Sequence, residues 1–142
     1  MDRKIKFRGR YDYDKTWFYG NLFYPDIKGR AHVATPQKGC YDINPSTIGE
    51  FTGREDVTQT EIFEDDILSW HDDIWGDSTE FRGLVFYKDA AFWVRTEEYY
   101  LGSFVPDSTD EELLLNIMDF EPLVIGNIHD NPELFKMPEN HG

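Results

Sequence analysis

The sequence predicts a mainly β protein, all-β or β-rich α+β, built from two small β subdomains. Aromatic residues make up 16% of the 142 residues, and such side chains suit the half-buried faces of pleated sheets. Short apolar segments alternate with stretches rich in Gly, Pro and Asp, which is the spacing of strands and turns. The 39% hydrophobic content also excludes a disordered acidic chain, which would lack the side chains needed for a core.

In the first half of the chain, a series of short segments has strand patterns. Residues 4–10 place Ile5 and Phe7 on one face and cations on the other, which is the period of a half-buried strand. A turn separates it from a second, aromatic strand over residues 16–24. Further short strands are predicted over residues 31–35, 41–43 and 47–52.

A polar stretch without apolar periodicity, residues 53–60, predicts a loop between two subdomains. The N-terminal β subdomain then spans residues 1–52, and an acidic C-terminal subdomain spans residues 61–142. Such a boundary in a chain of this length indicates two small units rather than two full-sized domains.

The C-terminal subdomain begins with two apolar pairs on either side of three acids, which predicts a tight turn leading into a strand. A loop over residues 71–80 precedes a β-hairpin formed by residues 81–87 and 91–95. Residues 121–128 predict a last strand. This order of elements is typical of a small SH3-like barrel.

One short helix is predicted near residues 109–118. Thr109 offers a hydroxyl cap, and Glu112 follows it three residues later, as in a capping box. Apolar residues recur after it at roughly helical spacing, at Leu113, Leu114, Ile117 and Met118. A further helical turn is predicted at residues 131–135, with Pro132 in an early position.

The net charge of −14 is unevenly distributed. Residues 1–60 hold ten Lys or Arg against eight Asp or Glu, a balance of +2, and residues 61–142 hold four against twenty, a balance of −16. Binding to phosphate backbones depends on Lys and Arg, so the second half is expected to repel nucleic acid. Any contact with nucleic acid would use the cations at the start of the chain, Arg3, Lys4, Lys6, Arg8 and Arg10. We interpret these cations instead as a solvated strand face that protects a sheet edge.

The sequence favours a cytoplasmic protein. Cys40 is the single cysteine, which excludes an internal disulfide and is typical of a reducing compartment. No apolar run approaches the length of a membrane helix, and residues 1–7 have no apolar region of the signal-peptide kind. Nothing near Cys40 in the sequence lowers its pKa, so we do not expect a catalytic thiol.

No motif with catalytic or ligand-binding spacing occurs, so we predict no catalytic, cofactor-binding or metal-binding residues, and no enzyme. The strongest candidate for a metal site combines His71, Asp72 and Asp73 with the acids and histidine at Asp77, Glu80, His129 and Asp130. Neighbouring residues of an extended chain point to opposite sides, and the spacing matches no known metal motif. We therefore interpret this stretch as a solvated acidic loop.

Two further patterns have structural interpretations. Glu64, Asp65 and Asp66 could supply paired carboxylates for glycoside hydrolysis, but many other pairs in so acidic a chain could do the same. The aromatic runs at residues 17–19 and 92–93 could stack bases, but packing is the simpler explanation. Consecutive aromatics of a strand lie on opposite faces, so one of each pair can remain exposed and favour a protein partner or self-association.

Four separated segments resemble the YopX family of small proteins carried by phages and prophages. They are Ile-Lys-Phe-Arg-Gly at residues 5–9, Thr-Ile-Gly-Glu-Phe-Thr-Gly at 47–53, Glu-Ile-Phe-Glu-Asp-Asp-Ile-Leu at 61–68 and Val-Ile-Gly-Asn-Ile-His-Asp-Asn-Pro-Glu-Leu at 124–134. Family members more often have glycine where this chain has Asp65, which indicates a turn residue at positive φ. The loop over residues 54–60 also departs from the family pattern. The resemblance implies a mobile-element context, a β-rich fold and self-association, and it implies no activity.

The leading functional hypothesis is a non-enzymatic phage or prophage accessory protein that binds another protein or itself, with no cofactor and no small-molecule substrate. One alternative is an acidic DNA mimic that inhibits a host DNA-binding enzyme. A second is a metal-dependent hydrolase that uses His71, Asp72 and Asp73. A nucleic-acid-binding role through the N-terminal cations ranks last.

Overall fold

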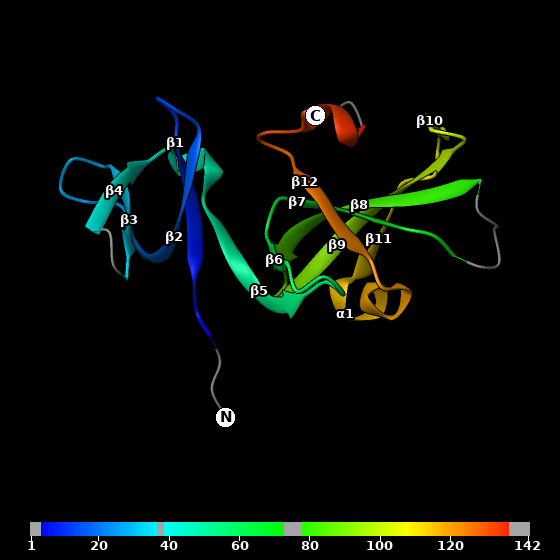
Figure 1. Ribbon diagram of the computed structural model, residues 1–142, viewed down its shortest axis with the longest axis horizontal. Coiled ribbons are helices and arrows are strands. Elements are labelled where there is room, and N and C mark those ends of the chain that lie inside the picture. Colours follow the sequence, from blue (N-terminus) through cyan, green and yellow to red (C-terminus); the bar gives the residue numbers. More distant parts are fainter. Residues whose placement is uncertain (1–3, 37–38, 73–77, 137–142) are drawn as a thin grey trace. The chain divides into compact units, whose positions relative to one another are not determined.

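The computed structural model describes residues 4–36, 39–72 and 78–136, and it divides the chain into two compact units, Met1–Arg54 and Glu55–Gly142 (Figure 1). Over these described residues the structure is mainly β, with two sheets, one of which forms a half-barrel, and a single short α-helix. The predicted fold class is thereby confirmed. In the described parts of the chain, no helix has the length and apolar character needed to cross a membrane.

The first unit is an antiparallel sheet with the strand order β4-β3-β2-β1-β5. The predicted strand over residues 31–35 has the bounds expected, and the others differ by a few residues. A 3₁₀ turn separates the last two strands. The elements are β1 (Phe7–Tyr11), β2 (Thr16–Phe23), β3 (Ala31–Thr35), β4 (Gly39–Ile43), η1 (Pro45–Thr47) and β5 (Gly49–Glu55).

Alternate residues of these strands form the core of the first unit. Ala31, Val33 and Ile43 are buried, and Phe18, Leu22 and Ile48 pack against them. The segment that follows β4 is hydrogen-bonded to β1. The Asn44 amide donates to the Arg10 carbonyl at 2.9 Å, and the Arg10 amide donates to Thr47 Oγ1 at 2.9 Å. These bonds satisfy backbone groups that the sheet ladder leaves over.

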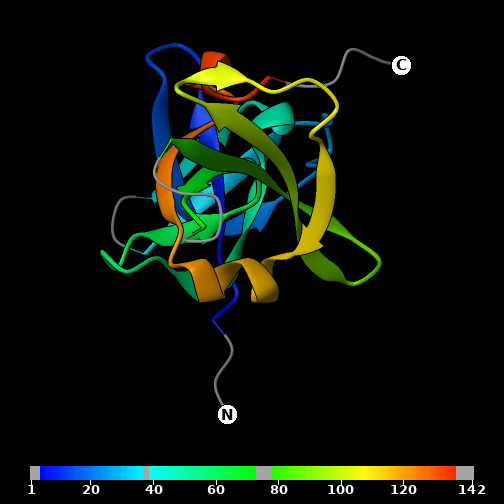
Figure 2. The ribbon, with the colours of Figure 1, turned by 90° about the vertical axis from the view of Figure 1, so that its right-hand side faces the viewer.

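The second unit is built on an antiparallel sheet with the order β10-β9-β8-β7-β12, and β11 also pairs with β9. Figure 2 shows the twist of the long β8–β9 hairpin and the helix near one end of the sheet. The elements are β6 (Glu61–Phe63), β7 (Asp66–Trp70), β8 (Thr79–Lys88), β9 (Ala91–Tyr100), β10 (Ser103–Phe104), β11 (Asp110–Leu113), α1 (Leu114–Ile117), η2 (Met118–Phe120), β12 (Leu123–Asn127) and η3 (Pro132–Leu134).

Both faces of this second sheet are covered. On one face, the buried residues of the central strands pack against α1, which contributes Leu114 and Ile117. On the other face, Ile67 and Leu84 pack against Phe135 from the C-terminal end. Since strand residues alternate between faces, β7 and β8 contribute to both clusters.

The predicted helix near residues 109–118 is shorter than expected. Asp110–Leu113 forms β11, which pairs with residues Trp93 to Thr96 of β9, and the helix covers only Leu114–Ile117. Two cations draw this segment to the sheet, because Glu111 binds Lys88 at 2.8 Å and Arg95 at 3.4 Å. An available sheet edge and these ion pairs outweigh a weak local helix preference.

The acidic turn between β6 and β7 confirms the prediction of positive φ at the position where family members more often have glycine. Asp65 has φ of 72°, and the neighbouring Asp66, which is 2% exposed, accepts a hydrogen bond from the Phe63 amide at 2.7 Å. The Asp65 carboxylate also contacts His129 Nε2 at 2.9 Å. Asp tolerates the left-handed region better than most residues do.

Substitutions at Asp65 are expected to separate the effect of its positive φ from the effect of its contact with His129. Asp65→Ala loses the His129 contact and keeps the backbone strain, so the second unit should lose about 1–2 kcal/mol of unfolding free energy. Asp65→Gly loses the contact but removes the strain, and the two effects should cancel to within about 0.5 kcal/mol. Urea unfolding of both variants tests this expectation, and equal losses in both would contradict it.

Candidate protein-binding groove

An open depression of about 440 Å³ lies on the helix-covered face of the second unit. A second depression of about 270 Å³ adjoins it, since both are lined by Asp72 and Phe120. We call the two together the acidic groove. Strands β7, β8, β9 and β11, the helices α1 and η2, and the segments that follow β7 and η2 all contribute to it. The lining residues are Trp70, His71, Asp72, Phe81, Thr96, Asp110, Glu112, Ile117, Asp119, Phe120 and Glu121.

The floor of the acidic groove is aromatic. Trp70 and Phe81 are paired across β7 and β8, and their rings stack with centroids 6.0 Å apart. Gly83 leaves room for this packing, because a Cβ there would lie 3.1 Å from the Trp70 ring and 2.1 Å from a Val94 methyl group. Phe120 adds a ring that is 41% exposed. An apolar ligand group would therefore find a preformed surface.

The sides of the acidic groove carry negative charge. Among its described lining residues there is no Lys or Arg. Five carboxylates line it: Asp72, Asp110, Glu112, Asp119 and Glu121. Glu112 is held in place by the Asn116 side-chain amide, which donates to it at 2.8 Å. Like charges collected on one concave surface attract cationic groups.

The structure brings only part of the predicted acidic loop to this surface. His71 and Asp72 line the smaller depression, and the Nδ1–H of His71 donates to the Thr79 carbonyl at 2.9 Å. Asp73 and Asp77 lie outside the described residues.

The other candidates for a metal site lie apart. Glu80 contacts Ser69 at 2.5 Å and Arg82 at 3.0 Å, and His129 contacts Asp65. Within residues 4–36, 39–72 and 78–136, no three His, Cys, Asp or Glu side chains form a group that could hold a metal ion.

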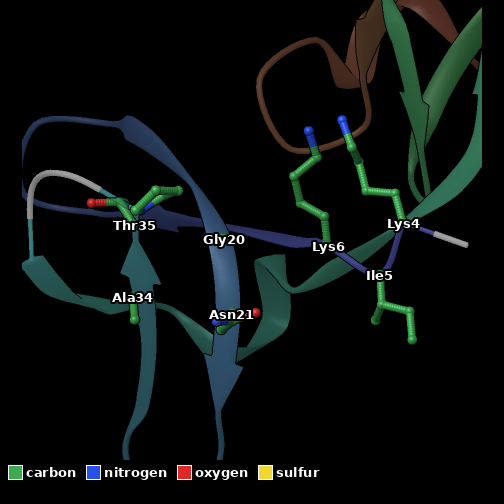
Figure 3. Close-up of a pocket in the computed structure, with 8 residues that line it drawn as sticks. Lys4, Ile5, Lys6, Gly20, Asn21, Ala34 and Thr35 are labelled. Atoms are coloured by element: carbon green, nitrogen blue, oxygen red, sulfur yellow. The ribbon is translucent and has the colours of Figure 1, made fainter. Parts of the chain in front are cut away.

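The N-terminal cations pack in the first unit. Lys6 lies 5.3 Å from the centre of the Phe51 ring and Arg8 lies 4.7 Å from that of Trp17, while Arg10 binds Asp12 at 3.1 Å. Arg3 is outside the described residues. A depression of about 430 Å³ is lined by residues 4–6, by Gly20 and Asn21 of β2, and by residues 34–36 at the end of β3. Figure 3 shows Lys4 and Lys6 extending to the same side while Ile5 points away.

The aromatic runs follow the expected alternation between faces. Phe18 lies in the first core, whereas Tyr19 is 41% exposed. Phe92 packs on the second core, whereas Trp93 donates from Nε1 to the Lys88 carbonyl at 3.0 Å. Cys40 is exposed on β4.

Comparison with known proteins decides the family. Residues 6–136 match the model of the YopX protein family. The chain belongs to the YopX family. The match includes every residue that lines the acidic groove. No curated protein matches the chain.

One solved structure similar to this YopX family member is the crystal structure of protein EF1440 from Enterococcus faecalis. The two chains are 23% identical with a TM-score of 0.52, and the match covers 95% of this chain and 100% of the other. At this identity the likeness shows a shared fold and nothing more.

The sequence interpretation missed most of the acidic groove. It assigned Asp110 and Glu112 to a helix, treated Asp119 and Phe120 as part of a connection, and placed Glu121 at the start of the last strand. The available signal was the alternation of Asp110 and Glu112 with Glu111 and Leu113, since alternate residues of a strand share a face. The aromatic floor gave no local signal because it forms only when β7 pairs with β8.

Proposed function

We propose that this YopX family member is a non-enzymatic accessory protein that binds another protein through the acidic groove. The partner segment carries Lys or Arg next to an apolar side chain. The observation that supports the proposal best is the combination of the exposed Phe120 with an aromatic floor and five carboxylates in one depression. A phage or prophage context fits an accessory role of this kind.

Each part of the surface has its own role in such binding. The apolar side chain covers Phe120 and the groove floor, which removes exposed aromatic surface from water. The cations approach Asp72, Asp110 and Glu112, where complementary charge increases the association rate and selects against acidic partners. The fully buried parts of the floor, such as Ile117 at 4% exposure, keep the surface rigid.

The DNA-mimic hypothesis has less support from the positions of the carboxylates. Mimicry of a phosphate backbone needs an exposed, regular array of charge, but several acids of the second unit have structural partners. Asp56 and Asp66 accept hydrogen bonds from backbone amides, and Glu111 is paired with Lys88 and Arg95. Glu97 is fully buried.

A defined peptide tests the proposed binding. The probe is a short peptide of alternating Lys and Leu, titrated into the ¹⁵N-labelled chain while amide shifts are followed by NMR. We expect saturable shifts at residues of the acidic groove. A triple variant with Asp72→Asn, Asp110→Asn and Glu112→Gln should bind about tenfold more weakly, which corresponds to about 1.4 kcal/mol.

The control is Glu133→Gln, which makes the same kind of charge change at an exposed position of η3, away from the groove lining. It should leave the affinity unchanged. A peptide of alternating Glu and Leu should not bind the acidic groove. Shifts that map outside the acidic groove, or equal weakening by the control and the triple variant, would contradict the proposal.

A further inference from the structure

The depression of about 430 Å³ in the first unit shares no lining residue with the acidic groove. Every residue that lines it belongs to Met1–Arg54. Figure 3 shows residues 4–6 on one side of it, with β2 and the end of β3 on the other. It is therefore a surface of the first unit alone.

The depression lies where β1 and β2 part. β1 pairs with Thr16–Gly20 of β2 and no further. Before Phe7 the chain follows β5 instead, since the Phe51 amide donates to the Lys6 carbonyl at 2.8 Å. In the described parts of the chain, residues 21–23 of β2 thus pair on one side only, with β3. We call their other side the open edge, and its backbone groups are of the kind that an added strand binds.

Residues 4–6 give the depression two different faces. Figure 3 shows Lys4 and Lys6 extending to one side and Ile5 to the other, which is the alternation of an extended chain. Ile5 is 60% exposed, and Phe23, at the end of the open edge, is 57% exposed. An added strand therefore meets cations on one of its faces and apolar surface on the other.

We propose that this depression binds an extended segment of another protein, in which acidic residues alternate with apolar ones. The segment pairs its backbone with the open edge and so extends the sheet. Its carboxylates face Lys4 and Lys6, and its apolar side chains cover Ile5. In this mode of recognition, main-chain hydrogen bonds supply affinity and alternate side chains supply specificity. Cross-strand pairs of opposite charge add to both.

The geometry favours a peptide over a nucleic acid at this place. Platforms for single-stranded nucleic acid combine cations with aromatic rings on which bases stack, and none of the described residues that line the depression is aromatic. The open edge instead offers backbone donors and acceptors at the spacing of a strand. The proposed segment is opposite in charge to the partner of the acidic groove, so the two inferences stand or fall separately.

Titration of a defined peptide tests the proposal. The probe is the capped peptide Glu-Val-Glu-Val-Glu, in which valine favours the extended conformation. It is added to the full ¹⁵N-labelled chain while amide shifts are followed by NMR. We expect saturable shifts at residues 4–6 and 21–23. We also expect slower hydrogen exchange of at least one amide of residues 21–23, which attraction between charges alone does not produce.

A charge variant and a matched control locate the carboxylate contacts. Lys4→Gln combined with Lys6→Gln should weaken binding of the probe about fivefold. Lys15→Gln combined with Lys28→Gln removes the same charge from exposed positions of the same unit that do not line the depression. This control should change the affinity by less than about twofold.

Two modified peptides separate strand pairing from charge attraction. Each carries one N-methyl group, and the two groups are on neighbouring amides in the middle of the probe. Neighbouring amides of a strand point to opposite edges, so one methyl group blocks pairing with β2 and the other does not. We expect one peptide to bind at least about tenfold more weakly than the other.

Three results overturn the proposal besides the absence of saturable shifts at residues 4–6 and 21–23. The first is equal weakening by the lysine variant and its control. The second is equal affinity of the two methylated peptides. The third is tighter binding of a short oligothymidylate at the same residues, because that result identifies a phosphate-binding surface.

Discussion

Replacement of Gly20 with alanine is expected to lower the unfolding free energy of the first unit by at least about 3 kcal/mol. Gly20 lies in β2, where its neighbour Asn21 pairs with Ala34 of β3. A Cβ at Gly20 would lie 2.0 Å from the Ala34 carbonyl oxygen and 3.2 Å from the Thr35 Cα. Both are backbone atoms, so the strands themselves would have to separate.

Two other substitutions serve as comparisons. Gly9→Ala would meet the Ile43 side chain, with Cδ1 at 2.0 Å and Cβ at 2.9 Å. Another rotamer relieves the Cδ1 contact at about 1 kcal/mol, and the Cβ contact needs a shift of a few tenths of an ångström, so the loss should be smaller than for Gly20→Ala. Asn21→Ala changes an exposed position of the same strand and should have little effect. Hydrogen exchange of the amides of β2 and β3 measures the stability of this unit separately. A smaller loss for Gly20→Ala than for Gly9→Ala would contradict the steric argument.

Replacement of Asp56 with alanine is expected to lower the unfolding free energy of the second unit by about 3 kcal/mol, since several backbone amides lose their acceptor at once. Asp56 Oδ1 accepts from the Thr58 amide at 2.8 Å, the Thr58 hydroxyl at 2.6 Å and the Thr60 amide at 3.1 Å. Asp56 Oδ2 accepts from the Val124 amide of β12 at 3.0 Å. The side chain thus joins the loop to the sheet.

The control for Asp56 is Asp14→Ala, which removes an exposed carboxylate that caps the Thr16 amide at 3.0 Å and should cost less than about 1 kcal/mol. Equal effects of the two variants in urea unfolding would contradict the assigned role.

The pH dependence gives a further check on Asp56. Hydrogen bonds from Thr58, Val124 and Thr60 outweigh burial and lower the pKa of Asp56. A lowered folded-state pKa means that the carboxylate stabilises the fold at pH values above the ordinary range of Asp, near 3.9. This contribution is lost as the pH falls below that range towards the lowered pKa. The Asp56→Ala variant should therefore lose less stability than the wild type on acidification.

The turn at Asp65 and the strand over residues 31–35 could be predicted because their signals are local. Ala31 and Val33 alternate with the less buried His32 and Ala34, and the acids at Asp65 and Asp66 mark a reversal. The sequence predicts a loop between the subdomains over residues 53–60, but β5 continues to Glu55 and Asp56 binds β12. That contact joins residues 68 positions apart, which no local pattern reveals.

The sequence by itself determined the β-rich class, the two units, the family and the concentration of acid in the second half, because composition, periodicity and short matching segments can be read directly along the chain. Only the tertiary structure decided where that acid lies. Asp110 and Glu112, which the sequence predicts in a helix, line the acidic groove because β11 pairs with β9. Trp70 and Phe81 form its floor because β7 pairs with β8. Strand pairing is a long-range interaction whose free energy depends on which edges are available, so these surfaces exist only in the folded chain.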